Sequence, residues 1–361
     1  MEQNIENQVP NEEKQIDQKE VDQKQVDQLE KEKQKAIKKE EKKNKRKNYW
    51  HEQKKNFKRN KSILWFIIPA ALFTIIFSYI PMFGVLFAFK DPSFDTAMRR
   101  GANILGALQY SKWTLETFKS IFNDKFWLSL WNSVEINLIK LVFVFPLSII
   151  IAIQLSEIKN QKISKLILII LCIPNFLSWT VVIKAWTSFF DPDIGFLGKM
   201  LSKLTNGEII SYYEASFKPL FVFYSAWKGA GWGSILYYAA ITSIDKSYYE
   251  SATIEGANKI QKAFHLTIPA IGGTIALMLV MMFSGFTGVG LEQLKLMLDP
   301  TTYIESQQTL DYYIYELSIG QGAGVSYVQA AALGVFNGLV GLTLLLAGNA
   351  LTTKTLHRGL W

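Results

Sequence analysis

The sequence Tyr248-Tyr249-Glu250-Ser251-Ala252-Thr253-Ile254-Glu255-Gly256-Ala257 forms a short polar stretch that continues through Phe264 to Ile268-Pro269. It lies between two apolar runs, each long enough to cross a bilayer, which takes about 20 residues in a helix. Asp245 is a suitable N-cap for a helix that begins just after it. Gly256 interrupts the helical pattern and permits a sharp turn. The stretch therefore predicts two short helices, which is more structure than a passive linker needs.

Two interpretations of this stretch remain open on its pattern alone. Tyr248, Tyr249 and Ala252 lie at helical spacing and could form one packing surface. Such a surface would dock a second protein. The alternative is an ordinary amphipathic loop.

The chain contains six apolar runs, which predict an all-α, polytopic membrane protein with six transmembrane helices. The runs extend over Ile63 to Phe89, Phe126 to Leu155, Leu166 to Trp186, Phe217 to Ile244, Ile268 to Val289 and Tyr327 to Leu351. Lys and Arg precede the first run, occupy the turn after the second and follow the last. Because positive residues stay inside, both termini and residues 245–269 are expected in the cytoplasm. The expected organisation is a tail over 1–61, a membrane domain over 62–355 and a short cytoplasmic end over 356–361.

The tail is strongly charged. Residues 1–61 contain 18 Lys or Arg and 13 Asp or Glu, and residues 31–61 alone contain 15 basic and 4 acidic residues. A segment this polar cannot bury enough apolar surface to offset its chain entropy, which predicts disorder or a loose helix. The basic block adjoins a membrane-length run, so its charge indicates topology or contact with anionic lipid rather than nucleic-acid binding.

The remaining residues lack the patterns of a catalytic site. The three histidines, His51, His265 and His357, lack metal-ligand spacing. The sequence over 195–200 lacks the spacing and the final Ser or Thr of an ATP-binding loop. We therefore expect a transport protein that is not an enzyme and draws energy from an ion gradient or from another subunit. Glu135 is nearly the only acid within the runs, which weakens the gradient alternative.

Two further features of the apolar runs are ambiguous. Glu135 and Lys140 lie within the second run, where an ionisable residue is either functional or extends to the membrane surface. The sequence Trp227-Lys228-Gly229-Ala230-Gly231-Trp232-Gly233 places three glycines in the fourth run. Glycine in a membrane helix permits a close approach of a neighbour or a bend.

The polar stretch resembles the EAA motif of ABC importer permeases, which reads Glu-Ala-Ala, three residues, Gly, nine residues and Ile-x-Leu-Pro. Glu250-Ser251-Ala252, Gly256 and Leu266-Thr267-Ile268-Pro269 match this spacing, with conservative departures at Ser251, Leu266 and Ile268. The resemblance covers about residues 62–355. Within the class, the chain is similar to maltose-type carbohydrate permeases, nearest the polysaccharide or oligosaccharide branch. The segments that carry this similarity are 227–233, 308–315 and 329–334.

The resemblance implies a division of labour among several subunits in a bacterial plasma membrane. Such a permease pairs with a second permease, and both contact a cytoplasmic ATPase dimer that binds ATP and Mg²⁺. An extracytoplasmic, lipid-anchored binding protein delivers the oligosaccharide, and the permease itself needs no cofactor. The residues implied in ATPase coupling are Tyr248, Tyr249, Glu250, Ser251, Ala252, Glu255, Gly256, Ala257 and Pro269.

Aromatic side chains in the fourth and fifth runs are candidates for the sugar pathway, since aromatic rings stack on the apolar faces of sugars. They are Trp227, Trp232, Tyr237, Phe283 and Phe286. Ordinary helix packing and an interfacial aromatic belt are the alternatives. Two other functions stay open: a stand-alone, ion-coupled sugar carrier, and a scaffold whose working part is the charged tail.

Overall fold

The computed structural model describes Lys42, Asn44, Lys45, Lys47 and Tyr49 of the tail and then residues 61–191, 194–204, 217–298, 304–319 and 324–356. The expectations for the rest of residues 1–60 and for 357–361 lie outside the described residues. The chain divides into two compact units, Met1–Phe83 and Gly84–Trp361.

The first unit ends in an apolar helical run. It contains α2 (Lys61–Thr74), the π-helical turn η1 (Ile75–Tyr79) and α3 (Ile80–Met82), and the 3₁₀ helix η2 (Phe83–Phe89) leads out of it. Proline has no N–H and its ring crowds the carbonyl four residues earlier, so Pro81 disfavours regular α-helix before it. The π turn at η1 accommodates this irregularity directly upstream of Pro81.

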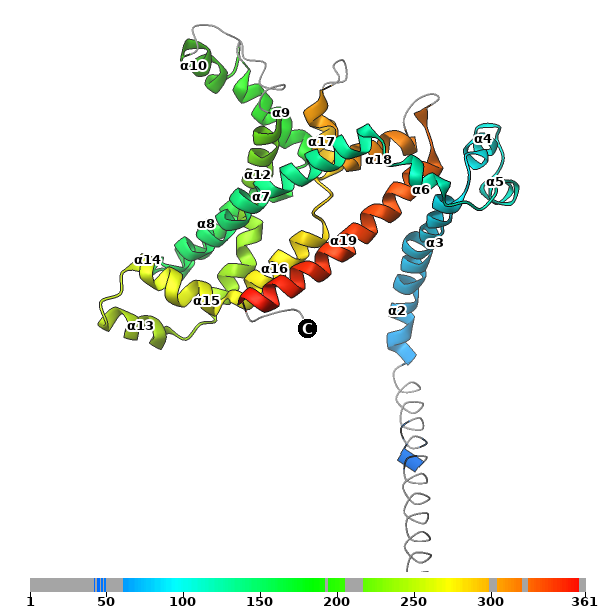
Figure 1. Cartoon of the computed structure of the whole chain (residues 1–361). Coiled ribbons are helices and arrows are strands. Elements are labelled where there is room, and N and C mark those ends of the chain that lie inside the picture. The colour runs from blue at the N-terminus through cyan, green and yellow to red at the C-terminus, as the bar shows by residue number, and fades with distance from the viewer. Residues whose placement is uncertain are drawn as a thin grey trace, which may run out of the picture. The chain divides into compact units, whose positions relative to one another are not determined.

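The second unit is built from helices (Figure 1). The long ones are α7 (Asp124–Ser156), α8 (Gln161–Phe176), α12 (Phe217–Thr242), α16 (Gly272–Ser284) and α19 (Tyr327–Leu356). The shorter ones are α4 (Ser93–Arg99), α5 (Ile104–Tyr110), α6 (Glu116–Ser120), α9 (Trp179–Phe190), α10 (Phe196–Leu204), α13 (Lys246–Ile254), α14 (Lys259–Lys262), η3 (Ala263–Thr267), α15 (Ile268–Ala270), α17 (Leu291–Met297), η4 (Glu305–Gln307) and α18 (Leu310–Ile319). In the described parts of the chain, β-pairing is limited to a bridge between Lys90 and Trp113.

Small residues bring the long helices together. The α12 helix packs against both α7 and α8, and α16 packs against α19. A Cβ atom at Gly231 would collide with the backbone carbonyl of Leu171 in α8, and one at Gly341 would lie 2.7 Å from the carbonyl oxygen of Ser284 in α16. Gly231 of α12 thus serves close helix approach, one of the two roles expected for the glycines of this run.

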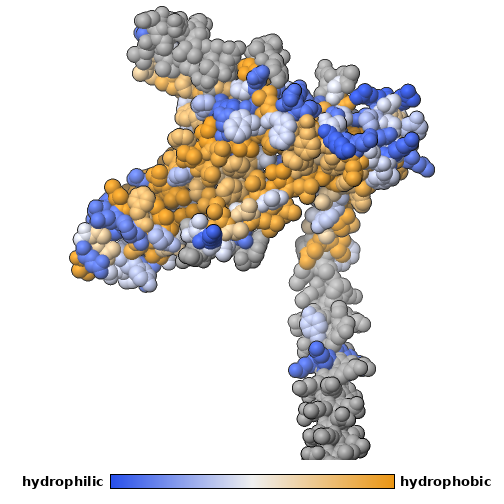
Figure 2. Space-filling model, viewed as in Figure 1, coloured by the Kyte–Doolittle hydropathy of each residue, from blue (hydrophilic) through white to orange (hydrophobic). Residues whose placement is uncertain are grey.

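Three helical stretches are long and apolar enough to cross a membrane: Ile67–Phe89, Asp124–Ser156 and Tyr327–Thr355. Two bent pairs also qualify when each pair is taken together, α8 with α9 and Lys259–Ala270 with Gly272–Ser284. The described chain therefore contains three such spans, or up to five with the bent pairs. The hydropathy of Figure 2 agrees with this result, because hydrophobic side chains cover the middle of the long helices of the second unit.

The run predicted as the third span, 166–186, is bent in the structure. The α8 helix ends at Phe176, α9 begins at Trp179, and the two axes differ by 97°. Leu177 and Ser178 are extended, and the Ser178 hydroxyl accepts a hydrogen bond from the Val181 N–H at 3.3 Å, which starts a new helix. The fifth run is bent as well, by 68° between α15 and α16.

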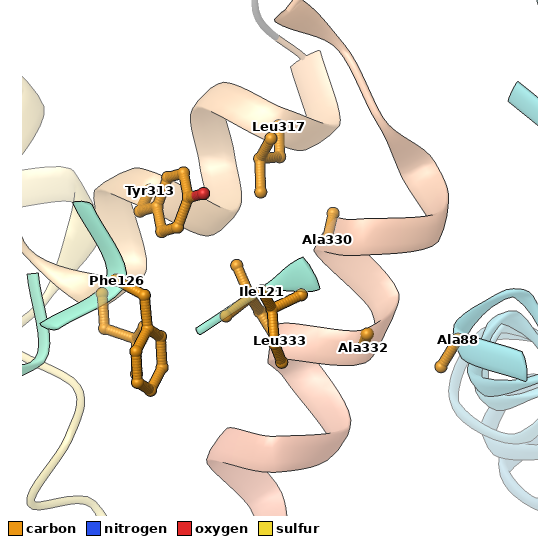
Figure 3. Close-up of a cluster of buried hydrophobic side chains, with 9 residues drawn as sticks. Ala88, Ile121, Phe126, Tyr313, Leu317, Ala330, Ala332 and Leu333 are labelled. Atoms are coloured by element: carbon orange, nitrogen blue, oxygen red, sulfur yellow. The ribbon is translucent and has the colours of Figure 1, made fainter. Parts of the chain in front are cut away.

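A buried apolar cluster lies where α18 covers the beginnings of α7 and α19. Its members are Ala88, Ile121, Phe126, Leu310, Tyr313, Leu317, Ala330, Ala332 and Leu333. Figure 3 shows their side chains converging from these separate segments. The polar stretch of residues 245–269 lies at the other end of the long helices, beside the α7–α8 turn (Figure 1).

Candidate functional site

The predicted two-helix stretch forms at the polar end of α12. The Asp245 carboxylate accepts the backbone N–H of Ser247 at 2.9 Å and caps α13. Ser247 holds the pKa of Asp245 below its usual value, because its backbone N–H and, to a smaller extent, its side chain form hydrogen bonds with the Asp245 carboxylate. The N-cap expected at Asp245 is confirmed.

The turn after α13 depends on Gly256. Its φ is +82°, in the left-handed region that favours glycine. The N–H of Gly256 donates to the carbonyl of Thr253 at 3.1 Å, and that of Ala257 donates to the carbonyl of Ala252 at 2.9 Å. These two bonds form a Schellman motif, which satisfies carbonyls left open by the end of the helix. The sharp turn expected at Gly256 is confirmed.

The second helix of the stretch has its own start signal. The Asn258 side chain accepts the backbone N–H of Gln261 at 2.9 Å, and the Gln261 side chain accepts that of Asn258 at 2.8 Å. This reciprocal pair is a capping box. The α14 helix then widens into the π turn η3 immediately before Ile268 and Pro269, as η1 does before Ile80 and Pro81.

Side-chain hydrogen bonds connect α13 to the segment that returns to the membrane. The hydroxyl groups of Tyr249 and Thr267 lie 3.0 Å apart, and Thr267 is buried. The Lys262 ammonium donates to the Thr253 hydroxyl at 3.3 Å. Two side-chain contacts therefore connect α13 to α14 and η3.

Tyr248 and Tyr249 do not form one exposed aromatic surface on α13. Tyr248 is 64% exposed, while Tyr249 turns toward Thr267 and is half-buried. Glu250, Ser251 and Glu255 are exposed, and Ala252 and Ala257 are half-buried. Sequence reasoning missed Ile254, which is 88% exposed at the end of α13. The sequence did contain a signal for Ile254, because it is an isolated large aliphatic residue in a polar segment.

A cleft of about 740 Å³ separates α13 from the turn between α7 and α8. Its lining includes Glu157 and Lys159 of that turn, Ile241 and Thr242 of α12, and Tyr249, Glu250 and Ile254 of α13. Part of α13 is therefore separated by this cleft from the α7–α8 turn and from the end of α12.

We expect Tyr249→Phe to weaken the mechanical connection between α13 and η3. The substitution removes the hydroxyl bonded to Thr267 and retains the ring, a loss of about 1 kcal/mol for a typical hydrogen bond. Transport per ATP hydrolysed should fall by about two- to fivefold. Tyr248→Phe is the matched control, because the Tyr248 hydroxyl makes no hydrogen bond within the part of the chain that the structure describes. Equal transport by both variants would contradict this role for Tyr249.

The ionisable residues of the second run have specific partners. The Glu135 carboxylate pairs with the Lys218 ammonium at 2.5 Å. The Lys140 ammonium donates to the carbonyl of Val289 at 2.9 Å and lies 4.8 Å from the centre of the Phe221 ring. Lys140 thus points into the protein. Of the two interpretations given for Lys140, extension to the membrane surface does not fit these contacts.

The non-helical segment Phe286–Gly290, between α16 and α17, is held by polar side chains. The Asn137 amide donates to the carbonyls of Phe286 and Gly288 at 2.9 and 3.0 Å. The Asp311 carboxylate accepts the N–H groups of Val289 at 2.9 Å and Gly290 at 3.2 Å. Irregular backbone at membrane depth requires such partners, because lipid supplies none.

The five candidate residues of the sugar pathway occupy different environments. Trp227 and Trp232 are exposed on α12, where Trp227 meets Trp186 and Trp232 meets Phe176 edge to face. Tyr237 is buried beside Phe145. Phe286 is buried and Phe283 half-buried, with ring centres 5.7 Å apart. The structure thus brings together only the last two.

Comparison with known proteins identifies the class. The model of the family described as "Binding-protein-dependent transport system inner membrane component" matches residues 144–355, which include α13 and α14. The chain belongs to this family and is a multi-pass membrane permease subunit of an ABC importer, as the resemblance in its sequence predicts. None of these comparisons supports an ion-coupled carrier.

Individual relatives place the chain more narrowly. It is 35% identical over 308 residues to "Protein LplB" of Bacillus subtilis (strain 168), covering 84% of this chain and 92% of LplB. It is 30% identical over 307 residues to the "Polygalacturonan/rhamnogalacturonan transport system permease protein YteP" of the same organism, covering 84% and 91%. A solved bacterial ABC transporter involved in import of the acidic polysaccharide alginate contains a chain that is 30% identical, with a TM-score of 0.70 over 83% of this chain and 98% of that one.

A second structure of this kind contains a bound delivery protein. The bacterial alginate ABC transporter in complex with an alginate pentasaccharide-bound periplasmic protein matches with a TM-score of 0.71 and 30% identity, over 85% of this chain and 99% of that chain.

Proposed function

We propose that this permease imports an oligosaccharide that an extracytoplasmic binding protein delivers, driven by a separate cytoplasmic ATPase. The observation that carries the proposal is the stretch from Asp245 to Pro269. It is capped at both helices, turned at Gly256, and its α13 helix is connected to η3 through Tyr249 and Thr267. The names of the alginate and polygalacturonan transporters support the oligosaccharide class.

In this proposal α13 is the helix that enters the ATPase. Glu250, Ser251 and Ile254 offer an exposed mixture of charge, hydroxyl and apolar surface, and the cleft behind them leaves α13 accessible. ATP and Mg²⁺ bind to the ATPase dimer, and the permease contributes no ATP site. Closure of the dimer moves α13, and the Tyr249–Thr267 and Lys262–Thr253 contacts carry the movement to α16. A second permease completes the pathway.

The same proposal includes six membrane spans with both termini in the cytoplasm. The α12 helix, of 26 residues, serves as the fourth span, and the bent pairs serve as the third and fifth. The tail over 1–61 and residues 356–361 then lie inside, and α4, α5 and α6 lie outside.

Single-cysteine labelling checks this orientation. The native Cys172 is buried, so Cys172→Ala gives a background without a reactive thiol. In that background, Tyr248→Cys should react with an impermeant maleimide only in inside-out vesicles, and Leu105→Cys only in right-side-out vesicles. Both positions are well exposed. Labelling of Tyr248→Cys from outside would overturn the proposed topology.

Reconstitution tests the function itself. The permease pair, the ATPase and the binding protein are placed in liposomes, and uptake of labelled oligosaccharides is followed with ATP inside. We expect uptake that requires both the ATPase and the binding protein. Gradient-driven uptake by the permease alone would overturn the proposal, as would ATP-dependent transport of a cargo other than a saccharide.

A further inference from the structure

The break between α8 and α9 lies beside the middle of α12. Lys228 is the twelfth of the 26 residues of α12, and its ammonium donates to the carbonyl oxygens of Asn175 at 2.7 Å and Leu177 at 2.6 Å, with that of Pro174 at 3.4 Å. The last carbonyls of a helix lack partners within the helix, and a positive charge at this end is favourable. Lys228 therefore caps α8 at the point where the proposed third span is broken.

The charge of Lys228 is not neutralised by a carboxylate in the described parts of the chain. Lys218 forms an ion pair with Glu135, and Lys140 donates to the Val289 carbonyl. Lys228 is half-buried, as Lys140 is, and Glu292, whose charge acts on it, lies beyond the 4.0 Å limit of an ion pair. An ionisable residue within a membrane span usually faces the bundle interior or a water-filled cavity.

One aromatic ring lies beside this ammonium, and two exposed rings belong to residues near it along α8 and α12. The Trp179 ring centre lies 5.3 Å from the Lys228 Nζ atom. Phe176, at the end of α8, is 75% exposed, and Trp232, one turn along α12 from Lys228, is 51% exposed. Their rings meet edge to face at 5.8 Å. Exposed rings beside a few polar groups are typical of sites that bind sugars, and broken membrane helices typically line transport pathways.

We propose that Lys228, Trp179 and Trp232 form a subsite for a carboxylate-bearing sugar, so that the permease selects oligosaccharides that contain uronate residues. The donors of Lys228 face neutral carbonyls, one of them only at 3.4 Å, and no carboxylate among the described residues lies within ion-pair distance. A sugar carboxylate would take the donor that faces the distant Pro174 carbonyl and form a charge-assisted hydrogen bond, while the rings contact the apolar face of the sugar. A neutral sugar would gain only the second contact. The inference rests on the proposed function and specifies its substrate class.

The test compares one saccharide with and without its charge. The complete transporter, with its partner permease, ATPase and binding protein, is reconstituted in liposomes, and uptake is measured for oligogalacturonates and for their fully methyl-esterified forms. In Lys228→Gln, which keeps a hydrogen-bond donor for the α8 carbonyls, we expect uptake of the acidic form to fall by at least about tenfold, the effect of losing one buried charge-assisted bond. Uptake of the ester should fall less than about threefold. Lys228→Arg should restore most of the acidic uptake.

The control is Lys184→Gln, which removes an exposed lysine of α9 that makes no contact with the α8 carbonyls. Its ratio of acidic to esterified uptake should equal that of the wild type. Equal losses of both substrates in Lys228→Gln would show a purely structural cap and overturn the inference, as would an unchanged ratio or the same selective loss in Lys184→Gln. If the wild type imported neutral glucans and neither galacturonate form, the uronate substrate class would be overturned and the proposed function would stand. Failure to import any saccharide would overturn the proposed function.

Discussion

Gly256→Val is expected to abolish ATP-driven uptake while the protein still inserts into the membrane. At a φ of +82° a β-branched side chain is strained by about 1–3 kcal/mol, although a Cβ atom there would touch nothing within 4 Å. The strain is relieved by opening the Schellman motif, which changes the angle between α13 and α14. The measurements are uptake in proteoliposomes and co-purification of the ATPase, and both should fall by at least about tenfold, since 1.4 kcal/mol corresponds to that factor.

The chain contains a matched control for this substitution. Gly101 ends α4 with a φ of +83°, and it also has no atom within 4 Å of an added Cβ. Its N–H donates to the carbonyl of Met98 and that of Ala102 to the carbonyl of Ala97, the same motif as at Gly256. Gly101→Val thus introduces equal backbone strain outside the 245–269 stretch. Loss of ATPase binding in both variants would contradict a specific role of the Gly256 turn.

The second large effect concerns the packing of α8 on α12. Gly231→Ala places a methyl group against the Leu171 backbone, so the two helices must separate at a cost of about 1–3 kcal/mol. We expect a clear fall in the melting temperature of the detergent-solubilised permease and a loss of uptake, because the α8–α9 break moves away from Lys228.

Gly229→Ala, two residues away on the same helix, tests whether the cause is packing. A Cβ atom at Gly229 meets nothing within 4 Å, and alanine favours helix over glycine by about 1 kcal/mol. Its melting temperature should equal or exceed that of the wild type. If both alanine variants lost stability equally, helix flexibility rather than the contact with Leu171 would be the reason for these glycines.

The features that local sequence determines were predictable. Asp245 and Gly256 act through bonds to residues two to five positions away, so the start and the turn of α13 follow from the sequence around them. The matched spacing to Pro269 identified the family. Apolar composition likewise located the long helices α7 and α19 to within a few residues.

The features that depend on distant contacts were not predictable. Leu177 carries no strong break signal, and the α8 carbonyls at the 97° bend are bound by a lysine about fifty residues later. The separation of Tyr248 from Tyr249 follows from Thr267, which periodicity within α13 does not reveal. Isolated charges such as Lys140 indicated importance, and only the fold identifies their partners.

The segment Phe286–Gly290 has a consequence for the order of assembly in the membrane. Its carbonyls are bound by Asn137 and Lys140 of α7, which the ribosome has already made when this segment emerges. The N–H groups of Val289 and Gly290 are bound by Asp311 of α18, which is synthesised later. Unsatisfied backbone groups are costly in lipid. The segment between α16 and α17 is therefore expected to reach its final position only after α18 has joined it, and nascent chains truncated before Asp311 should remain incompletely assembled.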